Sequence, residues 1–419
     1  MKVVLINHSD TLGGASVVTA RLASALRAEG VDARMLVVRR RAAESPYVAE
    51  AAPRLLSKAC FMVEEGMTWL DNGLHRRNLF SLDAARAGLP LHRHPWVREA
   101  DVVCLNWVNQ GMLSLRGVER IAATGKPVVW TMHDMWCATG LCHHAGECTR
   151  FRDACGRCPL IERPARSLDL SRRRHERKAD AYSRAGITFV AVSTWLAARC
   201  RESSLLRDAR LEVIPNAFPV DEFSLTPALG RAELGLPDDG RHIVLMAAAR
   251  LDAPVKGLHV AVDALNRLAA SGYSEKVLPV FAGELRHADA LSGLAMPFVH
   301  TGPVDDPVRL RSLFAHAKVV LSTSLYETLP GTLIEGQAAG AWPVSFGRGG
   351  QSDIIEHLRS GYIARWLDAD DIACGVAHAV DGDHDRASLR ESVEARFAAP
   401  AVARRYMELF SKILSQKQP

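Results

Sequence analysis

The chain has 419 residues, of which 48% are apolar and 24% are charged, and its net charge at pH 7 is +5. This length is more than one ordinary core can organise, so it predicts two domains, with three as the alternative. The composition is typical of a soluble globular enzyme. Because the positive charge is mild and no basic motif interleaved with aromatic residues accompanies it, nucleic acid is not an expected partner.

The N-terminal segment predicts a strand over residues 3–6, and this apolar run is too short for a signal peptide. No segment approaches the about 20 apolar residues that cross a bilayer. We therefore expect a cytoplasmic protein. Peripheral contact with the inner face of the membrane stays open, because a basic protein is attracted weakly to anionic lipid.

A glycine pair, Gly13 and Gly14, follows the first strand and precedes a helix predicted over 15–29. Adjacent glycines let the backbone approach a ligand closely, so we interpret the pair as a loop that faces a cleft between domains. A plain strand-to-helix turn is the alternative. The G-x-G-x-x-G fingerprint is absent and no acid has a clear role about 20 residues on, which argues against a dehydrogenase.

Four further apolar runs alternate with helical patterns, which predicts a parallel, doubly wound sheet. They lie at 33–38, 101–105, 127–132 and 187–192. The third of these runs is followed directly by His133 and Asp134. A lone histidine is more often a core residue, but a place at the end of a strand, next to an acid, favours a functional site.

Cysteines are concentrated in a loop predicted at about 137–158, which contains five of the nine in the chain. In a cytosolic protein such a cluster indicates a metal site before disulfide bonds. Thiolates from Cys142, Cys148, Cys155 and Cys158 could bind Zn²⁺ tetrahedrally and fold a loop that has little core of its own. We therefore predict a structural zinc site. Only Cys155 and Cys158 have the tight CxxC spacing, so free buried thiols and redox-active or disulfide-bonded cysteines remain alternatives.

Two segments of the first half could meet a lipid. The first is the basic run 171–178, on a predicted helix, and the second is 55–74, with apolar residues on an interrupted helical pattern. Their ordinary explanations are a solvated charged face and core packing. Contact with a membrane or a lipid pyrophosphate, and shaping of an acceptor pocket, are the functional alternatives.

The periodicity breaks near 215–223, and the second half then repeats the strand–helix scheme. A strand predicted over 243–246 is followed by Arg250 and Lys256 and then by a helix over about 257–270. In an open α/β sheet, ligands bind at the carboxyl ends of the strands. Two cations at that edge could hold a diphosphate without a metal ion.

A second loop of this kind carries two carboxylates. A strand over 318–322 leads to Glu327, and Pro330 and Gly331 then open a helix that contains Glu335 about one turn in. The start of a helix favours an anion such as a diphosphate, and carboxylates can hold sugar hydroxyls. The alternative is a helix with two solvated acids.

Taken together, these residues resemble the retaining glycosyltransferase family 4, whose two-domain fold is called GT-B. The resemblance covers most of the chain and rests on the loop 7–16, the segment 130–136, the segment 214–217, Arg250 with Lys256, the segment 327–335 and the segment 339–344. It implies two Rossmann-like, doubly wound α/β domains that face each other across a cleft. We expect an acceptor-binding domain at 1–217, a donor-binding domain at 218–399 and a C-terminal helix at 400–419 that can cross back to the first domain.

The resemblance also implies roles for individual residues. The catalytic set is His133, Arg250, Lys256 and Glu327, the donor-binding set is Gly331, Thr332, Leu333 and Glu335, and the acceptor or cleft loops contain Gly13, Gly14 and Asp134. Glu335 would hold the nucleotide ribose, and the amides from Gly331 onwards would contact the diphosphate. The chain departs from the family's usual Phe or Gly around 328–329, which leaves the donor sugar open.

A narrower resemblance, over 103–159, is to family members that occur with bacterial exopolysaccharide gene sets. It implies transfer of a sugar from a nucleotide-diphosphate sugar, UDP before GDP, to a saccharide acceptor that is lipid-linked. Catalysis would be retaining and would need no metal or cofactor. The alternatives are a non-catalytic assembly component with the same fold, and a glycogen phosphorylase-like enzyme, for which no motif nominates a lysine for pyridoxal phosphate.

Overall fold

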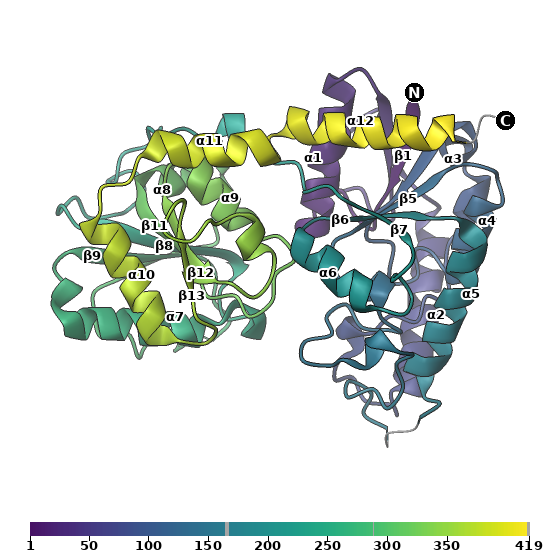
Figure 1. Ribbon diagram of the computed structural model, residues 1–419, viewed down its shortest axis with the longest axis horizontal. Helices are drawn as coiled ribbons and strands as arrows, with labels where there is room; N and C mark the ends of the chain where they lie inside the picture. Colours follow the sequence, from purple (N-terminus) through teal and green to yellow (C-terminus); the bar gives the residue numbers. More distant parts are fainter. Residues whose placement is uncertain (164–166, 288, 417–419) are drawn as a thin grey trace. The chain divides into compact units, whose positions relative to one another are not determined.

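The computed structural model describes residues 1–163, 167–287 and 289–416, which form two compact units (Figure 1). Unit 1 consists of Met1–Ala217 together with the segment that begins at Ala399, and unit 2 is Phe218–Ala398. The chain therefore passes between the units twice. Of the helix expected at 400–419, residues 417–419 lie outside the described part, and the helix itself, α12, runs over Ala399–Ser415.

Unit 1 is built on a parallel sheet, as its alternating pattern predicts. In the described part of the chain this sheet has seven strands in the order β3-β2-β1-β4-β5-β6-β7. The strands are β1 Lys2–Ile6, β2 Asp32–Val37, β3 Val48–Glu50, β4 Val102–Leu105, β5 Val128–Met132, β6 Thr188–Ala191 and β7 Arg210–Val213. The five predicted strands are confirmed to within one or two residues. The short edge strands β3 and β7 were not predicted, since neither is an apolar run.

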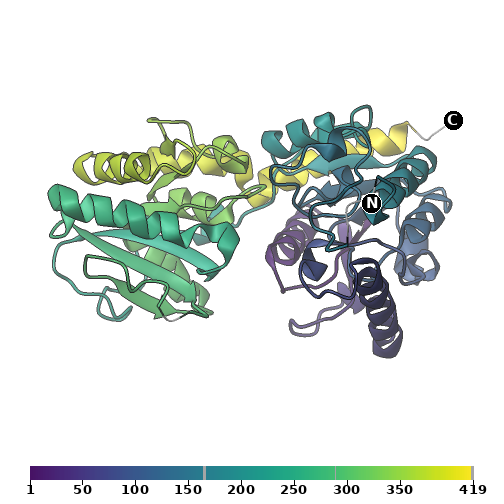
Figure 2. The same ribbon diagram turned by 90° about the horizontal axis from the view of Figure 1, so that it is seen from below.

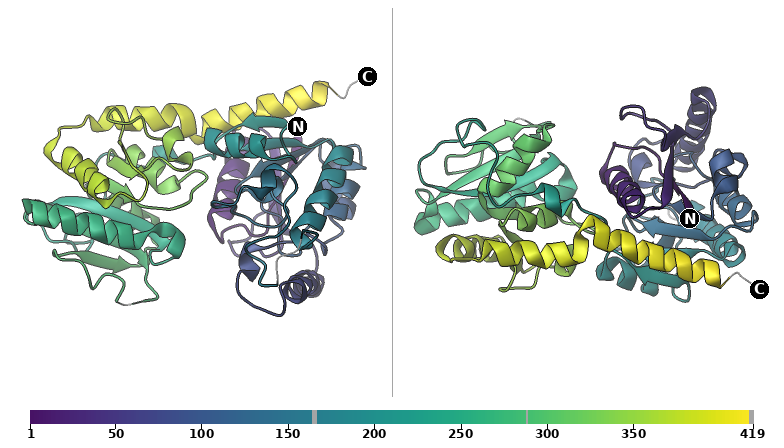
Figure 3. Two further views of the ribbon diagram at one scale, coloured as in Figure 1. Left: turned by 60° about the horizontal axis from the view of Figure 1, so that its bottom comes forward. Right: turned by 90° about the horizontal axis from the view of Figure 1, so that it is seen from above.

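The helices of unit 1 cover both faces of its sheet (Figure 1). They are α1 Gly14–Ala28, α2 Arg54–Asp71, α3 Pro95–Glu99, α4 Leu115–Ala122, α5 Leu170–Ala185, α6 Thr194–Glu202 and α12. The last helix packs beside α1, where Tyr406 and Phe410 enter the core with Leu22 and Leu26 (Figure 3). The Tyr406 hydroxyl lies 3.0 Å from Thr131 Oγ1 on β5. The helix α12 therefore completes the core of unit 1.

Unit 2 is a second three-layer α/β sandwich. Its sheet has the order β10-β9-β8-β11-β12-β13, with strands β8 His242–Arg250, β9 Val277–Glu284, β10 Val299–Gly302, β11 Ala317–Ser322, β12 Trp342–Phe346 and β13 Tyr362–Ala364. The helices are α7 Leu258–Leu268, α8 Pro307–His316, α9 Gly331–Ala338, α10 Ala369–Asp381 and α11 Arg386–Phe397. Helices α7 and α10 cover one face of this sheet, and α8, α9 and α11 cover the other (Figure 1).

Both sheets have a switch point, where consecutive chain segments leave in opposite directions. It lies between β1 and β4 in unit 1 and between β8 and β11 in unit 2. Open parallel sheets bind ligands at the carboxyl ends of the strands beside such a point. The loops after β1, β4, β8 and β11 are therefore the expected ligand-binding loops.

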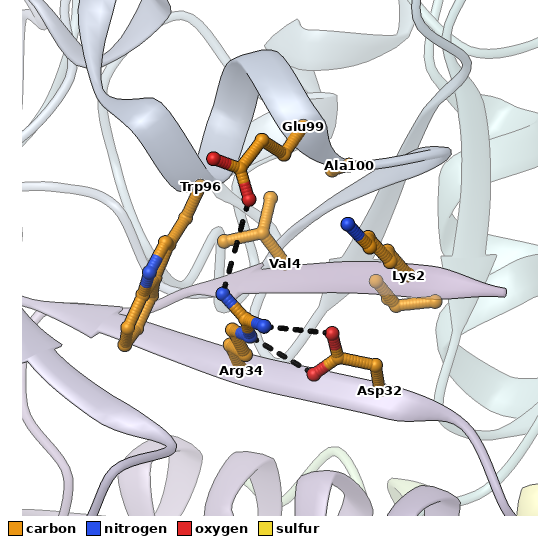
Figure 4. Close-up of a pocket in the computed structure, with 8 residues that line it drawn as sticks. Lys2, Val4, Asp32, Arg34, Trp96, Glu99 and Ala100 are labelled. Carbon is orange, nitrogen blue, oxygen red and sulfur yellow. Dashed lines mark hydrogen bonds and ion pairs between the residues drawn. The ribbon is translucent and has the colours of Figure 1, made fainter.

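The amino-terminal edge of the unit-1 sheet, by contrast, is closed by ion pairs (Figure 4). The Arg34 guanidinium donates to both carboxylate oxygens of Asp32, at 2.9 and 2.8 Å, and lies 4.0 Å from Glu99. It also covers the Trp96 ring at 5.3 Å. The space that remains is about 10 Å³, which is no more than a water molecule needs.

Helix α2 lies at the periphery of unit 1 (Figures 2 and 3). Most of its large apolar side chains are exposed. The buried residues of α2 are Ser57, Glu64 and Thr68, whereas Leu55 is 85% exposed and Met62 is 60% exposed. The core-packing explanation of this segment is therefore wrong. In the described ranges no helix, α2 included, has the length and hydropathy to cross a membrane.

Candidate functional site

The ion pair between Lys256 and Glu327 joins the two loops at the switch point of unit 2. Lys256 Nζ lies 2.5 Å from Glu327 Oε1, and the two side chains remain 29% and 22% exposed. Lys256 ends the turn after β8, and Glu327 follows β11. Because both groups keep contact with solvent, a ligand at this edge can reach either of them.

Backbone contacts bring these two loops together. The Leu325 amide donates to the Val255 carbonyl at 2.7 Å, and Thr323 Oγ1 donates to the Gly257 carbonyl at 3.0 Å. Gly257 has φ +62°, and a Cβ at this position would lie 2.2 Å from the Thr323 carbonyl oxygen. Only glycine fits so close an approach in a left-handed conformation. Gly257 therefore allows the close contact between the two loops that places Lys256 next to Glu327.

Arg250 has an acidic partner that the sequence reasoning missed. It is the last residue of β8 and not part of the loop, and its Nε donates to Asp252 Oδ1 at 2.7 Å. Asp252 Oδ2 also accepts the backbone N–H groups of Arg286 and His287, both at 2.9 Å. Burial raises the pKa of Asp252, but these donors outweigh it and hold that pKa at about 2. Asp252 thus ties the loop after β8 to the loop after β9.

A glycine-rich loop after β12 closes the other side of this edge. The Gly350 amide donates to the Glu327 carbonyl at 3.0 Å, and a Cβ on Gly350 would lie 2.0 Å from the Thr328 carbonyl. Gly349 has φ +146°. The glycine-rich run at 347–350 could have indicated this loop from the sequence, but it was not among the predicted site segments. Glu327 is therefore held from two neighbouring loops, at its side chain by Lys256 and at its carbonyl by Gly350.

Helix α9 begins at Gly331, and its N-cap residue, Pro330, makes no side-chain cap. A Cβ on Gly331 would lie 2.8 Å from the Phe218 ring, so glycine allows this packing. Leu333 is fully buried and could meet a ligand only through its amide, whereas Thr332 and Glu335 are partly exposed. The diphosphate and ribose roles of these residues stay predictions.

In unit 1, His133 and Asp134 lie at the carboxyl end of β5, as predicted. His133 Nε2 lies 3.1 Å from Asn106 Oδ1, at the end of β4. Burial lowers the pKa of His133 to about 4, although the Asp134 carboxylate opposes this effect. The imidazole is therefore neutral at pH 7.

Asp134 is the centre of a hydrogen-bond network that sequence reasoning missed. It accepts from Trp107 Nε1 at 3.1 Å, from the Trp136 amide at 2.7 Å and from His143 Nδ1 at 2.7 Å. Burial raises the pKa of Asp134, but the His143 imidazole outweighs it, so the carboxyl stays ionised. Burial also lowers the pKa of His143, and Asp134 more than reverses that shift.

The loops after β1 and β4 meet at Asn7. The Trp107 amide donates to Asn7 Oδ1 at 2.9 Å, and Asn7 Nδ2 donates to Ser16 Oγ, in the first turn of α1, at 3.0 Å. Gly13 has φ +87°, and a Cβ on Gly13 or Gly14 would meet no atom within 4 Å. Among the described residues, therefore, the glycine pair opens onto free space, while the loop behind it is fixed.

The neutral state of His133 predicts a pH-dependent stability. The unfolded chain binds a proton at this residue below pH 6.5, but the folded chain does so only below about 4, so the free energy of unfolding falls as pH drops between these values. The loss is at most about 3 kcal/mol, because the ring keeps part of its surface exposed. Urea unfolding between pH 7 and 4.5 should show a shallower loss in His133→Gln than in the native chain, and equal slopes would contradict the assignment.

The cysteine-rich loop is anchored to α5. Lys178, which is fully buried, donates to the Trp136 and Thr139 carbonyls at 2.6 and 2.9 Å, and Asp169 accepts from the Cys158 amide at 2.7 Å. Lys178 was part of the basic run 171–178. Other members of the run form ion pairs, such as Arg177 with Glu119. The basic run therefore anchors the cysteine-rich loop through Lys178 and forms ion pairs with neighbouring acids.

All nine cysteines lie in the described ranges and are free thiols. Burial and the neighbouring Cys158 and Cys155 thiols raise the pKa of Cys142 to about 12, so these side chains share one neighbourhood. The Gly140 amide donates to Cys155 Sγ at 3.3 Å. In the part of the chain that is described, however, no three His, Cys, Asp or Glu side chains are placed to hold a metal ion. The zinc site stays a prediction.

Elemental analysis of the purified protein tests this prediction. If Cys142, Cys148, Cys155 and Cys158 bind zinc, the protein should contain about one equivalent, and Cys155→Ser with Cys158→Ser should remove it, because a structural site needs all four ligands. Cys374→Ser, at an exposed cysteine of α10, is the matched control and should keep the metal. If the native protein is prepared with ample zinc and contains none, the zinc prediction is wrong and the free-thiol alternative holds.

A sequence profile described as "Glycosyltransferase Family 4" matches residues 12–222, and one described as "Glycosyl transferases group 1" matches 242–381. Over 163 residues, 37% of this chain, the sequence is 29% identical to 2-deoxystreptamine glucosyltransferase of Streptomyces kanamyceticus. Over 188 residues, 42% of this chain, it is 27% identical to WcaL of Salmonella typhimurium, named provisionally as a colanic acid biosynthesis glycosyltransferase. These matches span 41% and 46% of the two relatives.

Solved structures show the same fold over the whole chain. Anabaena HepE in complex with UDP and glucose has a TM-score of 0.63 and 15% sequence identity, with 98% of this chain and 99% of that chain covered. Sucrose-phosphate synthase of Thermosynechococcus elongatus has a TM-score of 0.64 and 16% identity, with 99% and 100% covered. The two parallel-sheet units therefore form the GT-B fold predicted for this chain.

Proposed function

Because the chain belongs to glycosyltransferase family 4, we propose that it transfers a sugar from a nucleotide-diphosphate sugar to a hydroxyl group of a saccharide acceptor. The observation that carries the proposal is the Lys256–Glu327 ion pair at the carboxyl edge of the unit-2 sheet. It places a cation and a carboxylate beside the start of α9, where the N-cap residue Pro330 makes no side-chain cap. This combination suits a diphosphate that is attached to a sugar.

In this proposal unit 2 binds the donor. Arg250, Lys256 and the amides from Gly331 to Leu333 take up the charge that develops on the leaving diphosphate. Glu327 orients the transferred sugar, and Glu335 holds the ribose. UDP is the expected nucleotide before GDP, and it is the one named with HepE among the structural neighbours.

Protein cations and helix amides can neutralise a leaving diphosphate on their own, so the proposed chemistry uses no metal ion. It is retaining: the leaving phosphate accepts the proton of the acceptor hydroxyl on the face of the sugar where the new bond forms. No separate base is then needed, which agrees with the pKa of about 4 at His133, because so weak a base removes a hydroxyl proton poorly. Its role would be to support the reacting centre through a hydrogen bond.

Unit 1 would bind the acceptor beside Gly13, Gly14 and Asp134. We propose a lipid-linked oligosaccharide of exopolysaccharide biosynthesis, with the protein in peripheral contact with the membrane. The likeness to WcaL supports the polysaccharide context. The outward apolar face of α2 supports the lipid.

Donor binding tests the proposal directly. In metal-free buffer with EDTA, UDP at about 100 times its dissociation constant should add about 2.7 kcal/mol to the stability of the protein and raise the unfolding midpoint by a few degrees. GDP, dTDP, ADP and NAD⁺ serve as comparisons. A larger shift with GDP would change the assigned nucleotide, and a shift that needs Mg²⁺ would contradict metal-free binding. No shift with any diphosphate would favour the non-catalytic assembly component.

A further inference from the structure

A pocket of about 340 Å³ lies at the carboxyl edge of the unit-1 sheet. Three segments form it: the loop after β1, the end of β2 and the first turns of α2. The lining residues are His8, Ser9, Leu12, Val38, Arg39, Arg41, Arg54, Leu55, Ser57, Lys58 and Phe61. Its volume is within the range of small-molecule sites. All of its walls belong to unit 1.

The pocket is strongly cationic. Four of its lining residues are basic, namely Arg39, Arg41, Arg54 and Lys58, and within the described ranges none is acidic. The nearby carboxylate of Asp10 is already occupied, because it accepts the Arg41 and Ala42 amides at 3.0 Å. Arg54 forms an exposed ion pair with Glu50 at 3.3 Å. The charged ends of the other three have no ion-pair or hydrogen-bond partner among the described residues.

Ser57 adds an unused polar group to this wall. Its side chain is only 6% exposed, and in the described part of the chain its Oγ has no hydrogen-bond partner. Leaving a buried hydroxyl without a partner costs free energy. A ligand oxygen in the pocket would remove that cost. The cations and the hydroxyl together match a phosphate group, whose oxygens accept several hydrogen bonds.

The wall formed by α2 continues outward as an apolar surface. We call it the α2 outer face, and it consists of Leu55, Leu56, Met62, Val63, Met67, Trp69 and Leu70, all exposed. The buried residues Ser57, Glu64 and Thr68 form the opposite stripe of the helix. Glu64 fixes that orientation, since its carboxylate accepts the Ala84, Arg86 and Ala87 amides at 2.7–3.0 Å.

Leu55 belongs both to the pocket and to the α2 outer face. A cationic pocket thus opens directly onto an apolar helix, which is the pattern of a site for an anionic headgroup on a hydrocarbon chain. A solvated, soluble sugar phosphate would leave this apolar surface uncovered. Contiguous exposed apolar faces mark binding surfaces in soluble proteins.

We propose that unit 1 binds a lipid phosphate, with the phosphate between Arg39, Arg41, Lys58 and Ser57 and the hydrocarbon along the α2 outer face. This inference rests on the proposed function, because it names the chemical class of the acceptor. The saccharide of that acceptor would extend from its phosphate. The pocket would then set which lipid-borne phosphate is accepted, while the helix holds the protein at the bilayer surface.

Vesicle co-sedimentation of the full-length protein tests the proposal. Phosphatidylcholine vesicles that contain phosphatidic acid, a phosphate monoester, should bind the native protein better than vesicles of equal charge made with phosphatidylserine. The double variant Arg41→Ala/Lys58→Ala should bind the phosphatidic acid vesicles at least about tenfold more weakly, because it loses two charge-assisted contacts. Arg76→Ala/Arg77→Ala, which removes two exposed arginines outside the pocket, is the matched control.

A second pair of measurements separates the pocket from the helix. Met62→Ser/Leu70→Ser should weaken binding to phosphatidic acid vesicles but keep the affinity for a water-soluble, short-chain phosphatidic acid. Arg41→Ala/Lys58→Ala should lose both. Inorganic phosphate alone should bind far more weakly than the short-chain lipid. Circular dichroism establishes that each variant is folded.

Several outcomes would overturn the proposal. They are equal binding to the two anionic vesicles, unchanged binding by Arg41→Ala/Lys58→Ala, no binding at all, and equal affinity for inorganic phosphate and the short-chain lipid. The UDP-induced thermal shift, recorded on the same samples, keeps the two proposals apart. Lost lipid binding with an intact UDP shift removes only the lipid assignment, whereas a missing UDP shift removes the proposed donor site.

Discussion

Replacing Lys256 by alanine should lower the turnover of sugar transfer by about 10²–10³-fold, since one preorganised group that stabilises charge in a transition state is worth that much. The variant also leaves Glu327, the group proposed to orient the donor sugar, without its partner at 2.5 Å. Glu327→Gln should lose a comparable factor. Because the two residues form one pair, the double variant should lose much less than the product of the single effects.

Initial rates with the donor identified by the binding panel measure this effect. Lys276→Ala is the matched control: it is a lysine of the same unit, paired with Asp381 at 3.1 Å, but it precedes β9 at the amino-terminal edge. It should keep the native rate. Native turnover in folded Lys256→Ala would remove Lys256 from the site, and strictly multiplicative losses would show that the pair does not act as a unit.

Replacing Asp134 by alanine should destabilise unit 1 by about 3 kcal/mol, a value at the lower end of that for breaking a buried ion pair. The change leaves His143 Nδ1, the Trp107 indole N–H and the Trp136 amide without their acceptor. Asp134→Asn should cost less, because its carbonyl oxygen can keep part of the network. The stabilities follow from urea unfolding at pH 7, monitored by tryptophan fluorescence.

Asp32→Ala is the control for the Asp134 variant. Asp32 lies in the same sheet and also pairs with a cation, Arg34, but its side chain is 32% exposed, so its loss should cost no more than about 1 kcal/mol. Equal destabilisation by the two substitutions would show that the Asp134 network adds nothing beyond an ordinary surface pair.

The central strands could be predicted because they are buried on both faces and read as uninterrupted apolar runs. Val102–Leu105 and Val128–Met132 are examples, and each is buried at every position. Edge strands carry no such run: every residue of Val48–Glu50 is half-buried, and its composition resembles that of a loop. A half-buried strand of three residues is too short to give a hydrophobic pattern from which it could be predicted.

The position of Lys256, Glu327 and His133 at the carboxyl edges of the sheets was predictable, because each lies in the loop after an apolar strand. Their partners were not, because each contact joins segments that are distant in the chain. Trp107 reaches Asp134 across 27 positions, and the Asn7 side chain binds the Trp107 amide across 100. No local spacing reports such a contact. Only the strand order, which places the ends of β1, β4 and β5 side by side, explains it.

Helix α2 shows a different limit. Its period of apolar residues is that of an ordinary amphipathic helix, and the pattern alone does not say which face turns inward. The choice depends on Glu64, whose carboxylate satisfies three amides of the segment 84–87. A single acid with three charge-assisted hydrogen bonds outweighs the apolar preference, because those amides would otherwise be buried without acceptors.

The return of α12 to unit 1 determines the order in which the two units can finish folding during synthesis. Unit 2 is one continuous stretch, Phe218–Ala398, so it can fold as soon as it emerges from the ribosome. Unit 1 must wait, because Tyr406 and Phe410 fill its core and are made after all of unit 2. Until unit 2 has been translated, the apolar residues of α1 that pack against α12, such as Leu22 and Leu26, therefore lack their partners.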